Sequence, residues 1–191
     1  MGKTRLEAFS DGVLAIIITI MVLELKVPLG DDLTALYELL PAFLSYLLSF
    51  VYVGIYWNNH HHMLHISKQV NGAVLWANLH LLFWLSLIPF SARWMGESHF
   101  AVLPVALYGV DLLLSAVAYY ILSHSLLALH GKESTLAKAL GADYKGKVSV
   151  VLYAIALPFA FFQVWVACAL YVLVALIWFV PDKRIEDVVV K

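Results

Sequence analysis

The sequence predicts an all-α integral membrane protein that crosses the bilayer as six transmembrane helices. Hydrophobic residues make up 63% of the 191-residue chain and charged residues only 13%, whereas soluble domains typically carry about 25% charged residues. The apolar residues gather in long runs between short polar stretches, and a membrane-crossing helix needs about 20 mostly apolar residues. Because no polar stretch is long enough to fold alone, residues 1–191 are expected to form a single transmembrane domain.

The first apolar run, residues 5–27, is predicted to be a retained helix rather than a cleaved signal peptide. Ser10 and Asp11 interrupt the run near its start, and no small-residue cleavage site precedes a polar mature region. Pro28 and Gly30 are residues that end helices, so the crossing is expected to stop before them.

Three further crossings are expected at residues 39–64, 70–95 and 100–129. The second of these contains Asn78, and the third contains Asp111. Polar and charged side chains are costly in contact with lipid. Asn78 is therefore expected to face protein, and Asp111 to face protein or an interface.

The C-terminal part is predicted to add a short interfacial helix within residues 131–146 and crossings at residues 147–162 and 165–180. The turn between these two crossings, near Gln163, is very short. A single helix over the whole apolar run would measure about 50 Å at about 1.5 Å per residue, which is too long for one crossing. Pro158 adds a break or kink, so two crossings are preferred over one.

The distribution of basic residues predicts the orientation of the chain. With six crossings, ten of the twelve Lys and Arg residues fall on one side: Lys3, Arg5, Lys68, Lys132, Lys138, Lys145, Lys147, Lys183, Arg184 and Lys191. Cytoplasmic loops are enriched in Lys and Arg, so both termini are expected in the cytoplasm of a protein of the cell membrane. The net charge of −1 gives no reason to expect a nucleic-acid partner.

A cluster of histidines near the end of the second crossing raises a different functional class. His61 and His65 share a helix face, and this spacing can bind zinc or iron, as in a histidine-dependent membrane metalloenzyme. The remaining histidines are scattered and no HExxH motif occurs, so hydrogen bonding to other helices without a metal is preferred. A proton-coupled carrier that uses Asp11, Asp111 or His124 is the other alternative.

One face of the first helix carries an aliphatic stripe. At 100° per residue, a stripe about 100° wide collects Phe9, Gly12, Ile16, Thr19, Ile20, Leu23 and Val27. Asp11 falls roughly on the opposite side, where it either caps the helix or faces neighbouring helices. If it faces neighbours, the stripe faces lipid, another subunit or a pore, and the periodicity does not choose among these.

The same helix carries a recognisable motif. Arg5, Phe9, Ser10 and Asp11 resemble the RxxxFSD signature of the transmembrane protein 175 family of potassium channels, and the similarity continues through residues 12–25. The similarity extends to Tyr56-Trp57, to His61-His62 and to Trp76-Ala77-Asn78-Leu79. After the third crossing it lies mostly in the hydropathy pattern rather than in particular residues.

The resemblance implies a potassium-selective channel rather than an enzyme: a homotetramer of six-helix subunits with helix one lining the pore. It also implies passive transport of potassium without a cofactor or bound metal. Carried over from the Phe9-Ser10-Asp11 anchor, the narrowest points become rings of Ile16, Ile20 and Leu23, and the selectivity hydroxyl becomes Thr19.

Two further groups of residues follow from this mechanism. We expect the pore helix to be held in place by Arg5, Phe9, Ser10, Asp11, Asn78 and His61. We expect cations to be concentrated at the outer mouth by Glu24, Asp31 and Asp32.

Overall fold

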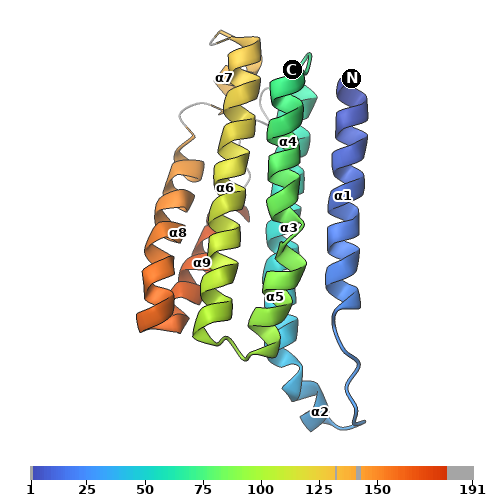
Figure 1. Cartoon of the computed structure of the whole chain (residues 1–191), viewed down its shortest axis with the longest axis vertical. Helices are drawn as coiled ribbons and strands as arrows, with labels where there is room; N and C mark the ends of the chain where they lie inside the picture. The colour runs from blue at the N-terminus through green and yellow to red at the C-terminus, as the bar shows by residue number, and fades with distance from the viewer. Residues whose placement is uncertain (1, 132, 141–142, 180–191) are drawn as a thin grey trace.

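The computed structural model describes residues 2–131, 133–140 and 143–179. This part of the chain is entirely helical: α1 (Lys3–Leu23), α2 (Leu33–Glu38), α3 (Leu40–Ile66), α4 (Gly72–Leu85), α5 (Ile88–Glu97), α6 (Val102–His130), α7 (Thr135–Leu140), α8 (Tyr144–Phe162) and α9 (Val164–Phe179). The long helices run roughly parallel or antiparallel to one another (Figure 1). The predicted all-α class is confirmed.

Five stretches are long and apolar enough to cross a membrane: Lys3–Leu23, Leu40–Ile66, Gly72–Glu97, Val102–His130 and Tyr144–Phe162. The last apolar helix, α9, has 16 described residues, fewer than the roughly 20 that a crossing needs. The sixth crossing therefore stays a prediction. α8 and α9 are separated at Gln163, and α8 continues through Pro158, so the break lies at the glutamine and not at the proline.

The third crossing was expected as one helix over residues 70–95, but the structure divides it into α4 and α5. The break lies at Ser86 and Leu87. Pro89 is the second residue of α5, and it has no N–H to donate to the carbonyl of Leu85, so an unbroken helix would lose that bond. The short helix α2 was also not expected. Asp32 begins it by accepting a hydrogen bond from the Ala35 amide at 2.9 Å.

Small residues allow the helices to approach closely, which matters because apolar surface in lipid gives little drive for helices to associate. A Cβ atom at Gly109 of α6 would overlap the hydroxyl of Tyr171 on α9. One at Gly96 of α5 would overlap Ser45 on α3. The glycines thus set the contacts α6–α9 and α3–α5.

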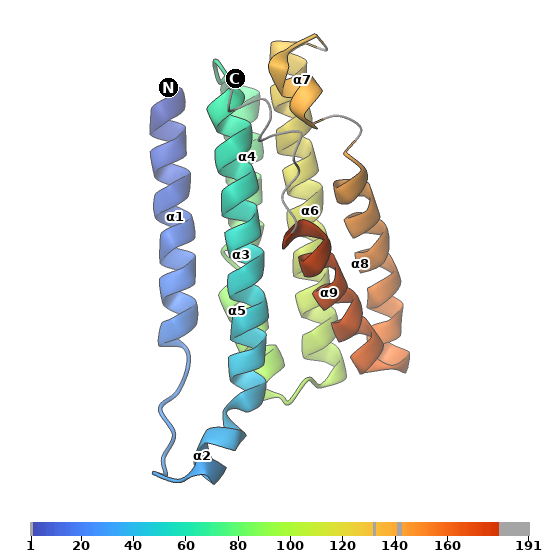
Figure 2. The ribbon, with the colours of Figure 1, turned by 180° about the vertical axis from the view of Figure 1, so that it is seen from behind.

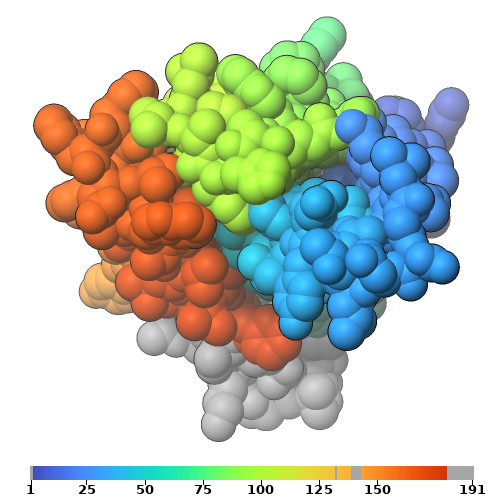
Figure 3. Space-filling view, turned by 90° about the horizontal axis from the view of Figure 1, so that it is seen from below, coloured from blue at the N-terminus to red at the C-terminus, as the bar shows by residue number. Residues whose placement is uncertain are grey.

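α1 lies at one edge of the subunit. From behind, it stands apart from α6, α8 and α9, with α3 between them (Figure 2). Seen from below, the segment that contains the end of α1 lies on the side opposite to the α8–α9 pair (Figure 3). One face of α1 is therefore packed on the subunit, and the other is left open.

Candidate functional site

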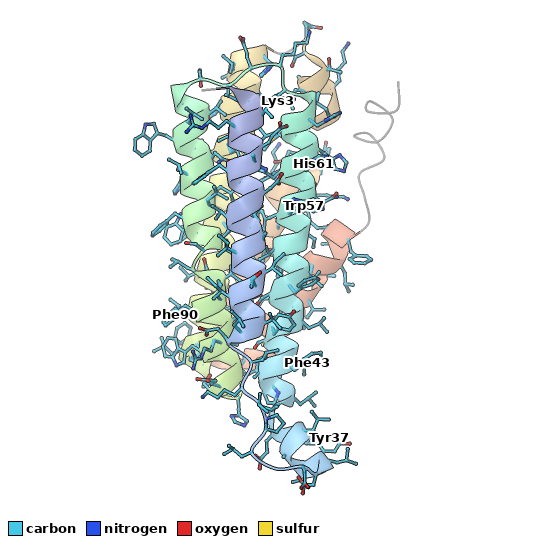
Figure 4. All side chains as sticks on the ribbon, turned by 90° about the vertical axis from the view of Figure 1, so that its right-hand side faces the viewer. Lys3, Tyr37, Phe43, Trp57, His61 and Phe90 are labelled. Carbon is cyan, nitrogen blue, oxygen red and sulfur yellow. The ribbon has the colours of Figure 1, made fainter. Side chains whose placement is uncertain are left out.

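The packed face of α1 carries residues at helical spacing: Leu6, Ser10, Leu14, Ile17 and Met21, each 4% exposed or less. α1 packs against α3, α4 and α5. Seen from the side in Figure 4, α1 lies in front of α3 and of the α4–α5 pair, with Phe90 at one flank and with Trp57 and His61 at the other. This arrangement leaves the outer face of α1 uncovered by its own subunit.

The uncovered face contains the aliphatic stripe that the helical wheel predicts. Ile16, Ile20 and Leu23 are 59%, 42% and 76% exposed, and Phe9 is 48% exposed. Thr19 is exposed between them. The stripe is therefore open to lipid, to another chain or to a pore, and these three alternatives remain.

Thr19 holds its hydroxyl in a defined direction. Thr19 Oγ1 donates a hydrogen bond to the carbonyl of Ala15 at 2.8 Å. The hydroxyl hydrogen is thereby used within the helix, while the oxygen keeps lone pairs that can accept. The Thr19 oxygen is therefore able to accept a hydrogen bond or coordinate a cation.

A chain of three hydrogen bonds ties α1 to α3 and α4. His60 Nε2 of α3 lies 2.7 Å from Asn78 Oδ1 of α4, and Asn78 Nδ2 donates to Ser10 Oγ of α1 at 3.0 Å. Ser10 Oγ donates in turn to the Leu6 carbonyl at 2.9 Å. Because a carbonyl oxygen only accepts, His60 carries its hydrogen on Nε2. All three side chains are buried, so leaving any of their polar atoms without a hydrogen-bond partner would be costly.

The hydrogen-bonded network that joins α1, α3 and α4 includes Ser10 and Asn78. Its histidine is His60 and not the expected His61. His61 instead stacks on Trp57 and on His65, with ring centroids 6.0 and 5.9 Å apart. The sequence contained a signal that would have selected His60: it follows Tyr52 and Tyr56 at intervals of four, and these three residues lie on the buried face of α3.

Asp11 lies at the edge between α1 and α3, and its side chain is exposed in the single subunit rather than buried. Trp57 Nε1 of α3 donates to Asp11 Oδ1 at 3.0 Å. Arg5 is also exposed. The FSD motif therefore anchors α1 through Ser10 and Asp11 on two adjacent sides, while its Phe9 stays on the open face.

The C-terminal end of α1 carries an ion-pair network that the sequence did not predict. Arg93 of α5 pairs with Glu24 at 3.0 Å and with Glu97 at 3.2 Å, and Lys26 pairs with Glu97 at 2.7 Å. The two acids and two bases cancel in charge. Glu24 is thus neutralised by a partner, contrary to its expected role as a free cation-attracting group.

The other two acids of the expected outer mouth lie in the connection between α1 and α3. Asp31 and Asp32 are exposed, and Asp32 also caps α2. None of the ion pairs found among the described residues includes either of them. These two carboxylates keep their charge available to the solvent.

A groove of about 660 Å³ runs along the open side of α1, between α1 and α5. Ile16 and Ile20 line one wall, and Phe90 and Trp94 line the other. Phe90 is 61% exposed and Trp94 is 36% exposed. A contiguous apolar surface of this kind on a membrane helix is suited to contact with lipid or with another protein chain.

The described residues contain no group of three His, Cys, Asp or Glu side chains able to hold a metal ion. The carrier candidates are also dispersed. Asp111 and His124 both lie on α6, about 20 Å apart along the helix axis, and Asp11 is on α1. The structure does not bring the three carrier candidates into one site.

Comparison with known proteins adds three matches. A sequence profile of the family described as "Endosomal/lysosomal potassium channel TMEM175" matches residues 5–89. A protein from Chryseobacterium sp. (strain P1-3), named a potassium channel, is 56% identical over 186 residues, which is 97% of each chain. A human relative, named an endosomal/lysosomal proton channel, is 38% identical over 96 residues, 44% of this chain and 19% of its own length.

The fold has a match among solved structures. The crystal structure of a protein from Chamaesiphon minutus, described as a lysosomal potassium-selective channel TMEM175 homolog, superposes with a TM-score of 0.80 at 27% sequence identity. The match covers 92% of this chain and 95% of that one. The relatives are named as channels and not as enzymes, which agrees with the prediction from the sequence.

Proposed function

Because this chain belongs to the TMEM175 family, we propose that it is a potassium channel whose ion path is lined by α1. The observation that carries the proposal is the aliphatic stripe on the open face of α1. Ile16, Ile20 and Leu23 are exposed there, while the opposite face of the helix is fixed to its own subunit. This face is the one that copies of the subunit would present to a shared axis.

The proposed constriction is hydrophobic. Rings of Ile16, Ile20 and Leu23 around an axis would exclude water, and a dry neck stops ions without a physical plug. Thr19 lies within the same stretch and would offer one hydroxyl oxygen per subunit to a partly dehydrated ion. Potassium loses its water at lower cost than sodium, so a neck that is hard to wet favours potassium.

We propose that the assembly is a homotetramer. The groove beside α1 supports contact with a second copy, since Phe90 and Trp94 extend the apolar surface of Ile16 and Ile20. An identical chain that covered Phe90 and Trp94 would bring the four α1 helices together, with Ile16 and Ile20 facing the shared axis. Closed rings of this kind are the usual outcome of a contact between identical chains that repeats by rotation.

We also propose that the N- and C-termini are cytoplasmic and that the protein lies in the cell membrane. The N-terminus and α7 lie at the same end of the subunit (Figure 1). Described basic residues of that end include Lys3, Arg5, Lys68 and Lys138. Lys183, Arg184 and Lys191 lie outside the described residues. The opposite end carries Lys26 and Arg93, both paired with Glu97, and the positive-inside rule favours the first end as cytoplasmic.

The proposal is tested by purifying the protein, reconstituting it in planar bilayers and recording currents in potassium and in sodium. We expect single-channel currents carried by potassium down its gradient, with no requirement for a second ion. Flux that stops when a proton gradient is removed would indicate a coupled carrier instead. Stoichiometric iron or zinc that is lost on His61→Ala and His65→Ala would indicate a metalloenzyme.

Removing both charges of Asp31 and Asp32 is expected to lower the single-channel conductance about twofold at low ionic strength. The two exposed carboxylates would raise the local cation concentration at the outer mouth, and salt screens this effect over a Debye length of about 10 Å at 0.1 M. Conductance is measured for Asp31→Asn with Asp32→Asn at low and at high potassium. Asparagine keeps the cap of α2.

The matched control is Glu133→Gln, which removes an exposed carboxylate from the α6–α7 connection at the other end of the subunit. Its conductance should equal that of the wild type at both concentrations. If the double variant had the same conductance as the wild type at low salt, these acids would not face the ion path.

A further inference from the structure

Asp111 is a carboxylic acid buried where α6 packs against α5. Its side chain is 5% exposed, and Ser91 Oγ of α5 donates a hydrogen bond to Asp111 Oδ2 at 2.8 Å. Within the described part of the chain, the second oxygen, Oδ1, has no hydrogen-bond partner, and neither does the buried Ser115 Oγ one turn farther along α6. Residues four apart share a helix face, so two unpaired buried oxygens lie on the same side of α6.

The titratable side chains around Asp111 inside the bundle are tyrosines. Tyr56 of α3 and Tyr108 of α6 lie close enough to interact electrostatically with Asp111. Tyr171 of α9 packs edge-on against Tyr108, and Tyr153 of α8 lies beside Tyr171. Tyrosine is neutral at ordinary pH because its unperturbed pKa is about 10, so none of these groups supplies a counter-charge.

No cation balances Asp111 within the part of the chain that the structure describes. The ion pairs found there do not include Asp111. Arg93, two residues beyond Ser91 on α5, is bonded to Glu24 and Glu97 at the outer end. His80 of α4 is exposed and accepts from Trp84. An ionised carboxylate with a single hydrogen bond is costly in such surroundings.

The serine that contacts Asp111 lies next to the break in the third crossing. α4 ends at Leu85, α5 begins at Ile88, and Ser91 is in the first turn of α5. Interrupted membrane helices are tolerated where their freed backbone groups are buried in protein, and such interruptions are common at ion and proton sites. The break and the unpaired oxygens are independent features that meet at the same contact.

We propose that Asp111, Ser91 and Ser115 form a proton-binding site at the α5–α6 contact, and that the bound proton sets how α5 packs on α6. In the neutral acid, Oδ1 carries a hydrogen that can be donated to Ser115 Oγ, directly after a small rotation or through one water. When the proton leaves to solvent, Oδ1 becomes an acceptor and Ser115 must turn to donate. The exchange makes and breaks only the O–H bond of the acid.

The site is separate from the α1 stripe, but α5 connects the two. Phe90 precedes Ser91 in sequence and lines the groove along Ile16 and Ile20. Ionisation of Asp111 would strengthen the hydrogen bond that Ser91 donates to Oδ2, because a charged acceptor bonds more strongly than a neutral one. The stronger bond would draw α5 towards α6 and move a wall that faces α1. Proton binding at Asp111 is accordingly expected to alter conduction without any contact between the proton and the ion path.

The site itself is tested by infrared difference spectroscopy of the purified protein, which detects the C=O stretch of a protonated carboxylic acid without any need for channel activity. We expect a band in the wild type at neutral pH that disappears in alkaline buffer. The band should be absent in Asp111→Asn and shifted in Ser91→Ala, where the hydrogen bond to Oδ2 is lost. The control Glu133→Gln should leave it unchanged.

Absence of the band in the wild type, or an identical band in folded Asp111→Asn, would overturn the proton site. Should Asp111→Asn fail to fold, Ser91→Ala and Ser115→Ala still decide the matter, because a band that neither variant shifts does not belong to Asp111.

The effect on conduction rests on the proposed channel function and is measured separately. Potassium flux in the wild type should differ about fivefold or more between about pH 5 and about pH 9, within the usual range of coupling between sites. Flux through Asp111→Asn should show at most a small part of this difference. An equal difference in both would overturn the link to α5. If the wild type gave no flux at all, the proposed function would fail, while the infrared band would still report the proton.

Discussion

Replacing Ile16 by asparagine is expected to raise the resting potassium current about tenfold and to abolish most of the preference for potassium over sodium. Ile16 is 59% exposed on the open face of α1, so the substitution leaves the contacts within the subunit intact. A polar ring would hold water in the proposed neck. Lowering the barrier to ion passage by about 1.4 kcal/mol increases the rate about tenfold, and a wet neck no longer requires an ion to shed water.

The measurement is planar-bilayer recording under potassium and sodium on opposite sides, from which current and reversal potential are read. Two controls separate position from polarity. Ile16→Val keeps an apolar ring and should keep the selectivity. Val22→Asn adds the same amide to α1 at a residue that is 46% exposed but lies off the stripe, and it should leave both quantities near the wild type. Unchanged current and selectivity in Ile16→Asn would mean that the constriction lies elsewhere.

Replacing Asn78 by alanine is expected to lower the stability of the subunit by about 1–2 kcal/mol and to loosen α1. The change removes both hydrogen bonds of the buried amide, which link His60 to Ser10. Two buried polar groups then lose a partner, a cost of about 1–3 kcal/mol in water-soluble proteins that is often smaller in membranes. Among the described residues, packing, the Asp11–Trp57 bond and the bond from Lys3 to the His65 carbonyl would still hold the N-terminal half of α1 to α3.

Stability is followed as the thermal unfolding midpoint in detergent, and α1 mobility as the rate of amide hydrogen exchange along residues 3–23. The matched control is Asn59→Ala on α3, whose side chain bonds only to the carbonyl of Ile55 in its own helix. Asn59→Ala should change both quantities little. Equal losses in the two variants would mean that the hydrogen bonds through Asn78 contribute no more than a part-buried amide bonded within its own helix.

The sequence determined the class of the protein and the identity of its most informative helix. Long apolar runs require helices that satisfy their own backbone in lipid, and this requirement does not depend on tertiary contacts. The RxxxFSD motif and the aliphatic stripe of α1 were likewise readable, because a helix of fixed pitch assigns each residue to a face. The wheel placed Ile16, Ile20 and Leu23 together before any packing was known.

Most of the site features that the sequence missed depend on a partner from another helix. The sequence alone predicts that Glu24 is a free acid, because its partner Arg93 is 69 residues away along the chain and is brought beside it only by the fold. His61 and His60 are neighbours in sequence, and only the rotation of α3 in the bundle decides which of them meets Asn78. The break between α4 and α5 follows from Pro89, but its position opposite Asp111 is a tertiary fact.

The sequence by itself therefore determined that the chain crosses a membrane as helices and that α1 carries one aliphatic face. Both properties follow from composition and local periodicity. Only the tertiary structure decided that this face is left open by the subunit and that Ser10 and Asp11 fix the opposite and adjacent sides. It also decided that Asp111 is buried with no counter-ion among the described residues. These properties depend on which helices are neighbours and how each is rotated, and helices that are apolar all round encode neither in their periodicity.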